Sequence, residues 1–411
     1  MSADSNPQTS QYRWVMLAAL WLGYFCFGMV SASLAPLITR IGQDLDLSHT
    51  ALGVVMGAWA LVYIAAAMPA GAALDRFGSR MGMAAGLFLV AASGLARAAA
   101  GDFTSLFLAV AIFGVGGPLI SVGAPKVISQ WFSSKERGTA MGIYMTGPYL
   151  GSAFALASAN TLLMPLFGDS WRLTVGAYGL LALAGSITWL LVAREPGAAS
   201  GEADGGKQAA GLKAFGALLR VDVVRTILVI SLAAFMFNHG INAWLPTILR
   251  ARGLDAAAAG LWASVPTLVG VVSALTIPRF AISERRVGIL ASLYGCLVLA
   301  TLMLAFTEGA GLIGGLILLG VARIIGTIAL LILMEAPRVG ARNMGAATGL
   351  YFTVGEIGGV IGPTMMGVVA DITGSFIGSI LALNFLALFL LLMTVPLRQA
   401  RMRGAVRQAG E

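Results

Sequence analysis

The sequence predicts an all-α polytopic membrane protein with twelve transmembrane helices in two pseudo-symmetric six-helix bundles. Of its 411 residues, 58% are hydrophobic and only 11% are charged, a balance that would not keep a globule of this length soluble. Runs of about 20 apolar residues, each long enough to span a ~30 Å hydrocarbon core, recur along the chain. Three stretches of the first half also match the second half at a shift of about 210 residues, as expected for a duplicated unit.

Twelve apolar segments are expected to cross the membrane. Only helices and closed barrels satisfy every backbone group in lipid, and these segments lack the two-residue alternation of barrel strands. We therefore expect helices over residues 14–38, 50–73, 80–100, 103–127, 138–163, 171–193, 223–249, 257–279, 286–306, 310–336, 344–369 and 374–397.

The duplication divides the chain into two halves. The stretches 25–40, 114–127 and 138–146 match, in order, the stretches 235–250, 326–339 and 345–353. Between the halves lies a Gly-, Ala- and Ser-rich segment with charges and no apolar run, which is typical of a linker. We expect Leu212 to Leu219 within it to form a short amphipathic helix on the cytoplasmic face. We predict an N-terminal bundle, a cytoplasmic linker, a C-terminal bundle and a cytoplasmic basic tail over residues 1–193, 194–222, 223–397 and 398–411.

The distribution of Arg and Lys predicts the orientation. Most of these residues fall on one side of the predicted membrane, and the other side holds only Arg40, Arg97, Arg172, Arg250 and Arg252. By the positive-inside rule both termini are cytoplasmic. Topology then accounts for the formal charge of +8, which argues against a nucleic-acid partner. The polar start of the chain and its full-length first apolar run predict no cleavable signal peptide. The short loops, without glycosylation sequons in the outer ones, favour the inner membrane of a bacterial cell.

Local motifs support a resemblance to a known family. The run GAALDRFGSR at 71–80 places an Asp-Arg pair and a tight glycine turn between two predicted helices. It resembles the signature loop of the major facilitator superfamily, and TGPYLGS at 146–152 is similar to that superfamily's Gly-Pro motif. Second-half copies occur as PRFAISERR at 278–286 and IGPTMMG at 361–367, so the resemblance covers the entire chain. It implies the major facilitator fold, in which the first, fourth, seventh and tenth segments line a central cavity.

The signature loop and its copy are candidate gating elements. An Asp-Arg network that also contacts the loop Lys135-Glu136-Arg137 would hold the cytoplasmic ends together and open during alternating access. For these loop residues, the structural role of holding the helix ends together and the gating role are the same. The residues concerned are Asp75, Arg76, Gly78 and Arg80, with Glu284 and Arg285 in the second copy.

Two charges lie in the middle of predicted segments. Arg323 is about 13 residues, or ~20 Å, from either end of the tenth segment, and Glu356 lies at similar depth in the eleventh. A charge at this depth costs at least ~2.5–3.5 kcal/mol, so each should face a partner or water. The superfamily often has an arginine in the fourth segment, where this chain has Ala111.

These two charges allow two interpretations. In one, Arg323 and Glu356 form a buried ion pair that joins two helices. In the other, Arg323 binds an anionic group through paired hydrogen bonds, and Glu356 is the proton-coupling residue. Ionised Glu356 would then hold Arg323, and protonation would release the guanidinium for substrate.

Further polar residues are candidate substrate contacts. Asn238 and Asn242 lie one turn apart on the seventh segment and share a face. Interhelical hydrogen bonding is the alternative role for both. His239 is a candidate substrate contact and a possible proton carrier, or is simply satisfied by a neighbour. Tyr24, in the first segment, offers a hydroxyl.

Enzymatic chemistry is not predicted. With only two His and two Cys residues, the sequence offers no metal-ligand spacing and no nucleophile-base arrangement, and GVGG at 114–117 lacks the Lys-Ser/Thr of a phosphate loop. We therefore expect no cofactor and no metal. The sequence favours a monomeric secondary transporter of a small organic anion, driven by protons in the lipid bilayer. The alternatives are a proton-coupled exporter of drugs or cationic metabolites, in which Glu356 binds the cation, and a non-transporting sensor.

Overall fold

A computed structural model describes residues 11–195, 216–336 and 339–409. Throughout these ranges the regular structure is helical, and no strand occurs in them. Eleven of the described helices are long and apolar enough to cross a membrane. The described residues form two compact units, which we call unit 1 (11–195 with 245–264) and unit 2 (216–244 with 265–336 and 339–409).

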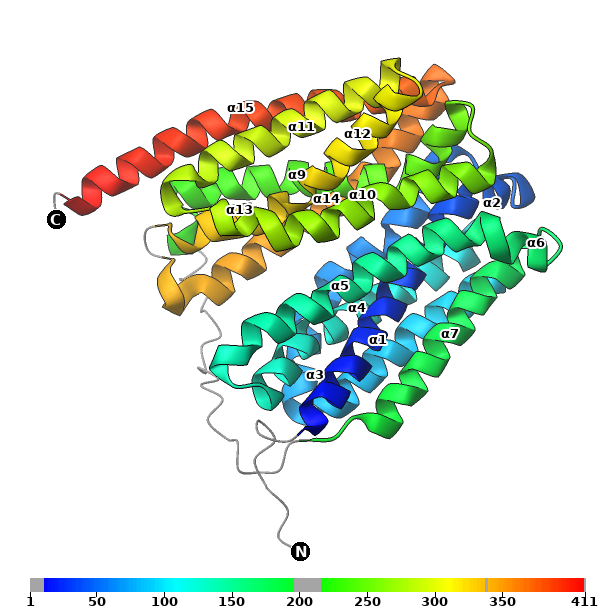
Figure 1. Cartoon of the computed structure of the whole chain (residues 1–411), viewed down its shortest axis with the longest axis horizontal. Helices are drawn as coiled ribbons and strands as arrows, with labels where there is room; N and C mark the ends of the chain where they lie inside the picture. Colours follow the sequence, from blue (N-terminus) through cyan, green and yellow to red (C-terminus); the bar gives the residue numbers. More distant parts are fainter. Residues whose placement is uncertain (1–10, 196–215, 337–338, 410–411) are drawn as a thin grey trace, which may run out of the picture. The chain divides into compact units, whose positions relative to one another are not determined.

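Unit 1 contains the first group of helices (Figure 1). Within it, α1 packs against α5 and α7, and α3 packs against α4 and α7. The elements are α1 (Tyr12–Ala32), η1 (Ala35–Leu37), α2 (Ile38–Asp44), α3 (His49–Ala98), α4 (Phe103–Trp131), α5 (Ser134–Ser158), the π-helical η2 (Ala159–Leu163), α6 (Met164–Leu166) and α7 (Trp171–Val192).

Helix α3 holds two of the predicted segments. Its 50 residues would span ~75 Å if straight, more than twice the hydrocarbon thickness. The helix bends at Gly78, whose φ of 80° and ψ of 164° lie outside the helical region. This residue separates the predicted segments 50–73 and 80–100. Each of the twelve predicted segments therefore corresponds to all or part of one of the eleven helices, and the predicted fold class is confirmed.

A buried arginine caps the break in the first predicted segment. Arg97 is only 2% exposed, although the sequence placed it among the cations of the outer side. Its Nη1 donates to the carbonyl of Val30 at 2.7 Å and to Ser33 Oγ at 3.2 Å, and its guanidinium lies 5.6 Å from the ring centre of Phe113. Val30 is in the last turn of α1, where carbonyls lack helical partners and carry the negative end of the helix dipole. Arg97 is therefore a helix cap and not a solvated charge.

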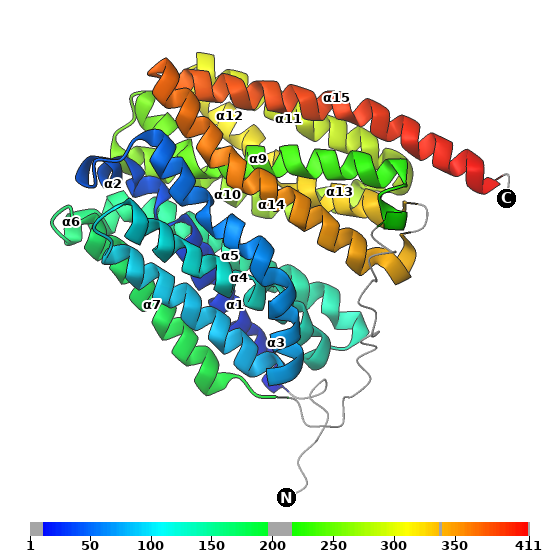
Figure 2. The same ribbon diagram turned by 180° about the vertical axis from the view of Figure 1, so that it is seen from behind.

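Unit 2 contains the second group of helices. Helix α15 lies along α11 in both views (Figure 1, Figure 2). The unit takes in most of α9 (Asp222–Ala251) and part of α10 (Ala256–Thr276), followed by η4 (Ile277–Phe280), η5 (Ser283–Arg285), α11 (Arg286–Phe306), α12 (Ala310–Val321), η6 (Ala322–Ile324), α13 (Ile325–Met334), α14 (Gly340–Thr373) and α15 (Phe376–Ala409).

Glycines let α9 and α14 pack at backbone distance. A Cβ atom built on Gly358 would lie 2.0 Å from the carbonyl oxygen of Leu232, and one on Gly362 would lie 2.1 Å from that of Met236. Any side chain at these two positions would force the helices apart. Small residues at such contacts are typical of membrane helix pairs. The close contact fixes which side chains of α9 face α14.

The tenth predicted segment differs from the expected continuous helix. Residues Ala310–Met334 are the most apolar of the candidate spans, yet the helix is interrupted by the 3₁₀ turn η6 between α12 and α13. Discontinuous membrane helices are frequent at transporter binding sites. Arg323 lies in this turn.

The domain boundaries of the sequence analysis stay predictions. Most of the linker 194–222 lies outside the described residues, as does the first half of its expected helix at 212–219, whereas residues 216–218 are described and helical. At the other end, α15 continues as one helix to Ala409 and includes most of the predicted basic tail 398–411.

Candidate functional site

Arg323 is held by neutral side chains from two other helices. Its Nη2 donates to Oδ1 of Asn242 on α9 at 2.6 Å and to Oγ1 of Thr267 on α10 at 3.1 Å. The arginine is half-buried, and Thr267 is fully buried. Neither partner is ionisable, so these two bonds orient the guanidinium without neutralising its charge.

The path of the Arg323 side chain depends on a glycine. A Cβ atom built on Gly270 of α10 would lie 2.6 Å from Cδ and 3.2 Å from Cβ of Arg323. One turn before Arg323, a Cβ atom built on Gly320 would lie 2.8 Å from the carbonyl oxygen of Pro266. The aliphatic part of Arg323 therefore crosses α10 where that helix has no side chain. This contact directs the guanidinium toward Thr267.

Asn242 extends the polar contact along α9. Its Nδ2 donates to Oδ1 of Asn238 at 3.0 Å, while its Oδ1 accepts from Arg323. Asn238 is exposed on the surface of unit 2. Both predicted asparagines thus belong to one chain of hydrogen bonds that begins at the guanidinium. The chain runs in one direction, from Arg323 through Asn242 to Asn238.

Glu356 has a different partner from the one considered in the sequence analysis. Oε2 of its carboxylate lies 3.9 Å from Nε2 of His239. Among the described residues, this is the ion-pair contact of Glu356, and Arg323 is not its partner. The Glu356 side chain is buried and that of His239 nearly so, at 8% and 12% exposure. Oε2 of Glu356 accepts no hydrogen bond from the described residues. The hypothesis that ionised Glu356 holds Arg323 is therefore not the arrangement found here.

The imidazole of His239 is enclosed on two sides. The ring of Phe235 stacks on it with centroids 5.8 Å apart, and a Cβ atom built on Gly359 would lie 2.6 Å from its Nδ1. The same Cβ would lie 2.8 Å from Oε2 of Glu356. Gly359 thus leaves the space in which the imidazole and the carboxyl group approach each other.

Tyr24 lies in unit 1. Its hydroxyl donates to the carbonyl of Ile120 at 3.3 Å, and its ring meets the edge of Tyr144 with centroids 5.0 Å apart. The side chain is 8% exposed. These contacts favour packing for Tyr24, and its substrate role stays a prediction.

The signature loop of unit 1 forms several polar contacts. Asp75 pairs with Lys126 at 2.8 Å, and the guanidinium of Arg76 lies over the ring of Phe77. The backbone N–H of Arg80 donates to Oε1 of Glu195 at 2.7 Å, where the bend at Gly78 leaves room for the carboxylate. Glu195 and Lys126 were not among the predicted gating residues. Glu195 lies two residues after the sixth predicted segment, which is the signal that could have identified it.

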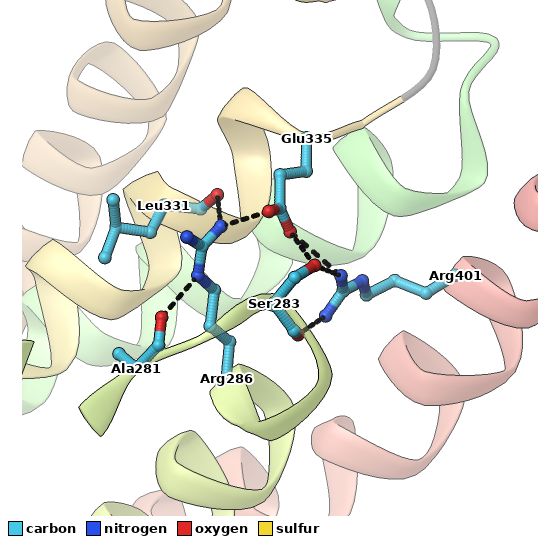
Figure 3. Close-up of polar contacts among 6 residues, drawn as sticks. All are labelled: Ala281, Ser283, Arg286, Leu331, Glu335 and Arg401. Atoms are coloured by element: carbon cyan, nitrogen blue, oxygen red, sulfur yellow. Dashed lines mark hydrogen bonds and ion pairs between the residues drawn. The ribbon is translucent and has the colours of Figure 1, made fainter. Parts of the chain in front are cut away.

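The corresponding end of unit 2 uses neighbours of the predicted residues. Glu284 and Arg285 are exposed in η5. Beside them, Glu335 pairs with Arg286 and Arg401 and accepts from Ser283 Oγ at 2.8 Å (Figure 3). The helix α11 begins at Arg286, so this arginine, and not Arg285, is turned toward the end of α13. We call Ser283, Arg286, Glu335 and Arg401 the unit 2 clasp.

Comparisons with known proteins agree with this architecture. The family model described as Major Facilitator Superfamily matches residues 20–363. The hexuronate transporter of Bacillus subtilis (strain 168) is 24% identical, with 85% of this chain and 86% of that protein covered. The "Probable galactarate/D-glucarate transporter GudP" of Escherichia coli (strain K12) is also 24% identical, with 95% and 94% covered.

Solved structures show the same fold. The crystal structure of a bacterial homologue of the human lysosomal transporter Spinster, inward-facing and occupied, superposes with a TM-score of 0.71 at 18% identity. The match covers 96% of this chain and 98% of that one. The family and the fold are those of transporters of small solutes and not of enzymes.

Proposed function

Since the chain belongs to the Major Facilitator Superfamily, we propose that it is a secondary active transporter that moves a small organic anion with protons across the inner membrane by alternating access. One observation carries the proposal. Arg323 lies midway along a membrane-crossing segment, and the two side chains that accept these hydrogen bonds from it, Asn242 and Thr267, are neutral. A guanidinium so placed favours a carboxylate, which it can bind through two parallel hydrogen bonds.

The relatives support an anionic substrate. The two curated relatives described above are named for hexuronate and for galactarate or D-glucarate, all of which carry carboxylate groups. The directional chain from Arg323 through Asn242 to Asn238 adds polar groups suited to the hydroxyls of such acids. We propose a sugar acid or a related small carboxylate as the substrate class.

The remaining roles belong to the same proposal. Glu356 is the proton-coupling residue, because it is a carboxyl group buried in a membrane segment. The signature loop and the unit 2 clasp gate the cytoplasmic side. Both termini are cytoplasmic, and the working unit is a monomer, since one chain holds both halves.

Uptake into proteoliposomes tests the proposal. Uptake of sugar acids, monocarboxylates and organic cations is measured with and without a pH gradient. The proteins compared are wild type, Arg323→Ala and the control Arg225→Ala, whose arginine is exposed near the start of α9. Loss of a charge-assisted bond worth about 1.5–3 kcal/mol predicts at least about tenfold weaker anion uptake for Arg323→Ala alone.

Other outcomes would select a different function. Cation transport that survives Arg323→Ala but is lost in Glu356→Gln would favour a proton-coupled exporter. Anion uptake that is equal in all three proteins would reject Arg323 as the binding residue. A protein that moves no member of the panel would favour a sensor.

A further inference from the structure

We infer that His239 and Glu356 form a single two-residue proton site, and that Gly359 is the positioning residue that lets the two groups meet. This inference rests on the proposed proton-coupled function and assigns His239 to the proton step in place of substrate contact. The atoms that would exchange the proton are Nε2 of His239 and Oε2 of Glu356, 3.9 Å apart. A closure of about 1 Å would bring them within hydrogen-bond distance.

Burial favours sharing between these two groups. Both side chains are almost fully enclosed, and Oε2 of Glu356 has no hydrogen-bond donor among the described residues. An isolated carboxylate in such a place would be costly, and so would an isolated imidazolium. With one proton, the pair is either neutral acid with neutral imidazole or carboxylate with imidazolium. The proton passes from the carboxyl oxygen to Nε2 and back, and the net charge stays zero.

Neighbouring residues of α9 and α14 hold His239 and Glu356 in position. Phe235 stacks on the imidazole and also fills the space beside Gly355, where a built Cβ would lie 3.0 Å from its ring. Gly359 leaves the gap that the ring and the carboxylate share. The stacking on Phe235 therefore restricts rotation of the imidazole.

The ionisable groups nearest the pair, among the residues that the structure describes, are two tyrosines and Arg323. Tyr351 on α14 meets the ring of Phe235 edge-on with centroids 5.8 Å apart, and Tyr294 on α11 is close enough to Tyr351 to interact electrostatically. Arg323 on η6 bonds to Asn242 and Thr267. Neither tyrosine carries a charge at neutral pH in its ordinary state. In this proposal Arg323, which bonds to Asn242 on the same helix as His239, is the charge to which the pair responds.

Helix α9 connects the proton site to the proposed anion site. His239 and Asn242 are three residues apart, a rise of about 4.5 Å along one helix. A second proton gives the pair a net positive charge, which opposes Arg323, and an anion bound at Arg323 removes that repulsion. Binding of the anion therefore favours uptake of the proton, and the reverse holds by linkage. The geometry predicts cotransport of anion and proton in the same direction.

The first test changes the gap but leaves both ionisable groups in place. In Gly359→Ala the new Cβ separates His239 from Glu356, whereas Gly349→Ala, on the same helix, meets nothing within 4 Å. We expect Gly359→Ala to lose at least about tenfold of pH-driven accumulation while counterflow without a gradient stays within about twofold. Gly349→Ala should keep both. Equal loss of both activities in Gly359→Ala, or retention of both, would overturn the inference.

The second test needs no transported substrate. Infrared titration follows the carbonyl band of protonated Glu356, identified by its absence in Glu356→Gln, in wild type, Gly359→Ala and His239→Gln. A shared proton requires the midpoint to move by about one pH unit or more when His239 is replaced. An unmoved midpoint rejects the pair even if Gly359→Ala fails to fold. A moved midpoint in a protein that transports no anion would reject the proposed function and leave the proton site standing.

Discussion

The Arg323 guanidinium donates to Asn242 across 2.6 Å, and Asn242 in turn donates to Asn238 on the preceding turn of α9. Because Asn242 uses its oxygen for the arginine, its nitrogen is the atom left to point along the helix. The arginine thereby fixes the orientation of an amide that would otherwise be free to rotate. Asn242 is therefore a positioning residue for Arg323 as much as a candidate contact for substrate.

Asn242→Asp should remove anion transport and preserve the fold. The substituted carboxylate keeps the size of the amide and would pair with Arg323, so the guanidinium would be neutralised before substrate arrives. We expect the KM for the anion to rise at least about tenfold, with thermal stability in detergent equal or higher. If Asn242 serves only to join α9 to the tenth segment, Asp should perform as well as Asn, and the KM would not change.

Gly270→Ala should displace Arg323 without changing any charge. The new methyl group would lie 2.6 Å from Cδ of the arginine, so the side chain must leave its path across α10 and lose its bond to Thr267. We expect a higher KM for the anion and destabilisation by about 1–3 kcal/mol from overpacking. Gly288→Ala, whose Cβ would meet nothing within 4 Å, is the control. Equal transport kinetics in the two variants would contradict the proposed role of Gly270.

Gly78→Ala should destabilise the signature loop. A φ of 80° is strained for any residue with a side chain, and the Cβ would lie 2.6 Å from Oε1 of Glu195. We expect a loss of about 1–3 kcal/mol, measured as a lower Tm in detergent. Gly71→Ala lies in the same helix with nothing within 4 Å and should be neutral or slightly stabilising. A Tm for Gly78→Ala at or above that of Gly71→Ala would show that the bend does not need glycine.

The N-terminus of α4 should give a pH-dependent contribution to stability. The backbone N–H of Ser105 donates to Asp102 at 2.7 Å, and with the Ser105 hydroxyl it lowers the pKa of this carboxyl below its ordinary value of 3.8. The folded state thus favours the charged form, so the contribution is present above the unfolded pKa and is lost as pH falls through the folded one.

Asp102→Asn provides the comparison for that contribution. Asparagine also caps helices but does not ionise. The Tm difference between wild type and Asp102→Asn should be constant near neutral pH and should change once the pH falls below about 4. A difference that stays constant down to the acid limit would mean that the capping bonds do not favour the carboxylate.

The fold could be predicted from the sequence because lipid imposes strict rules on the chain. Apolar runs of the right length, with the cations gathered on one side, are sufficient to define the segments. The turn η6 was not predicted, because neither a proline nor any other strong breaker occurs between Val321 and Ile325. Its surroundings come from residues 266–270 on another helix, which a local pattern does not reveal.

The sequence predicted which residues belong to the candidate site but not which of them contact each other. Spacing on α9 places Asn238 and Asn242 on one face and turns His239 about 100° away from Asn238. It does not say which helix each face meets. That is decided by the close packing of α9 on α14 at Gly358 and Gly362, which brings His239 to Glu356.

Arg323 also affects the insertion of its segment into the membrane during synthesis. The span Ala310–Met334 contains fourteen Leu, Ile and Val residues beside its single arginine. At the centre of a segment each of these contributes about −0.3 to −0.6 kcal/mol to insertion, which together outweighs the about +2.5–3.5 kcal/mol of the arginine. The segment can therefore leave the translocon for lipid on its own. Asn242 and Thr267 are synthesised before this segment, and their hydrogen bonds to Arg323 form after the segment has inserted. Polar substitutions among the surrounding Leu and Ile residues would therefore first reduce insertion of the protein into the membrane.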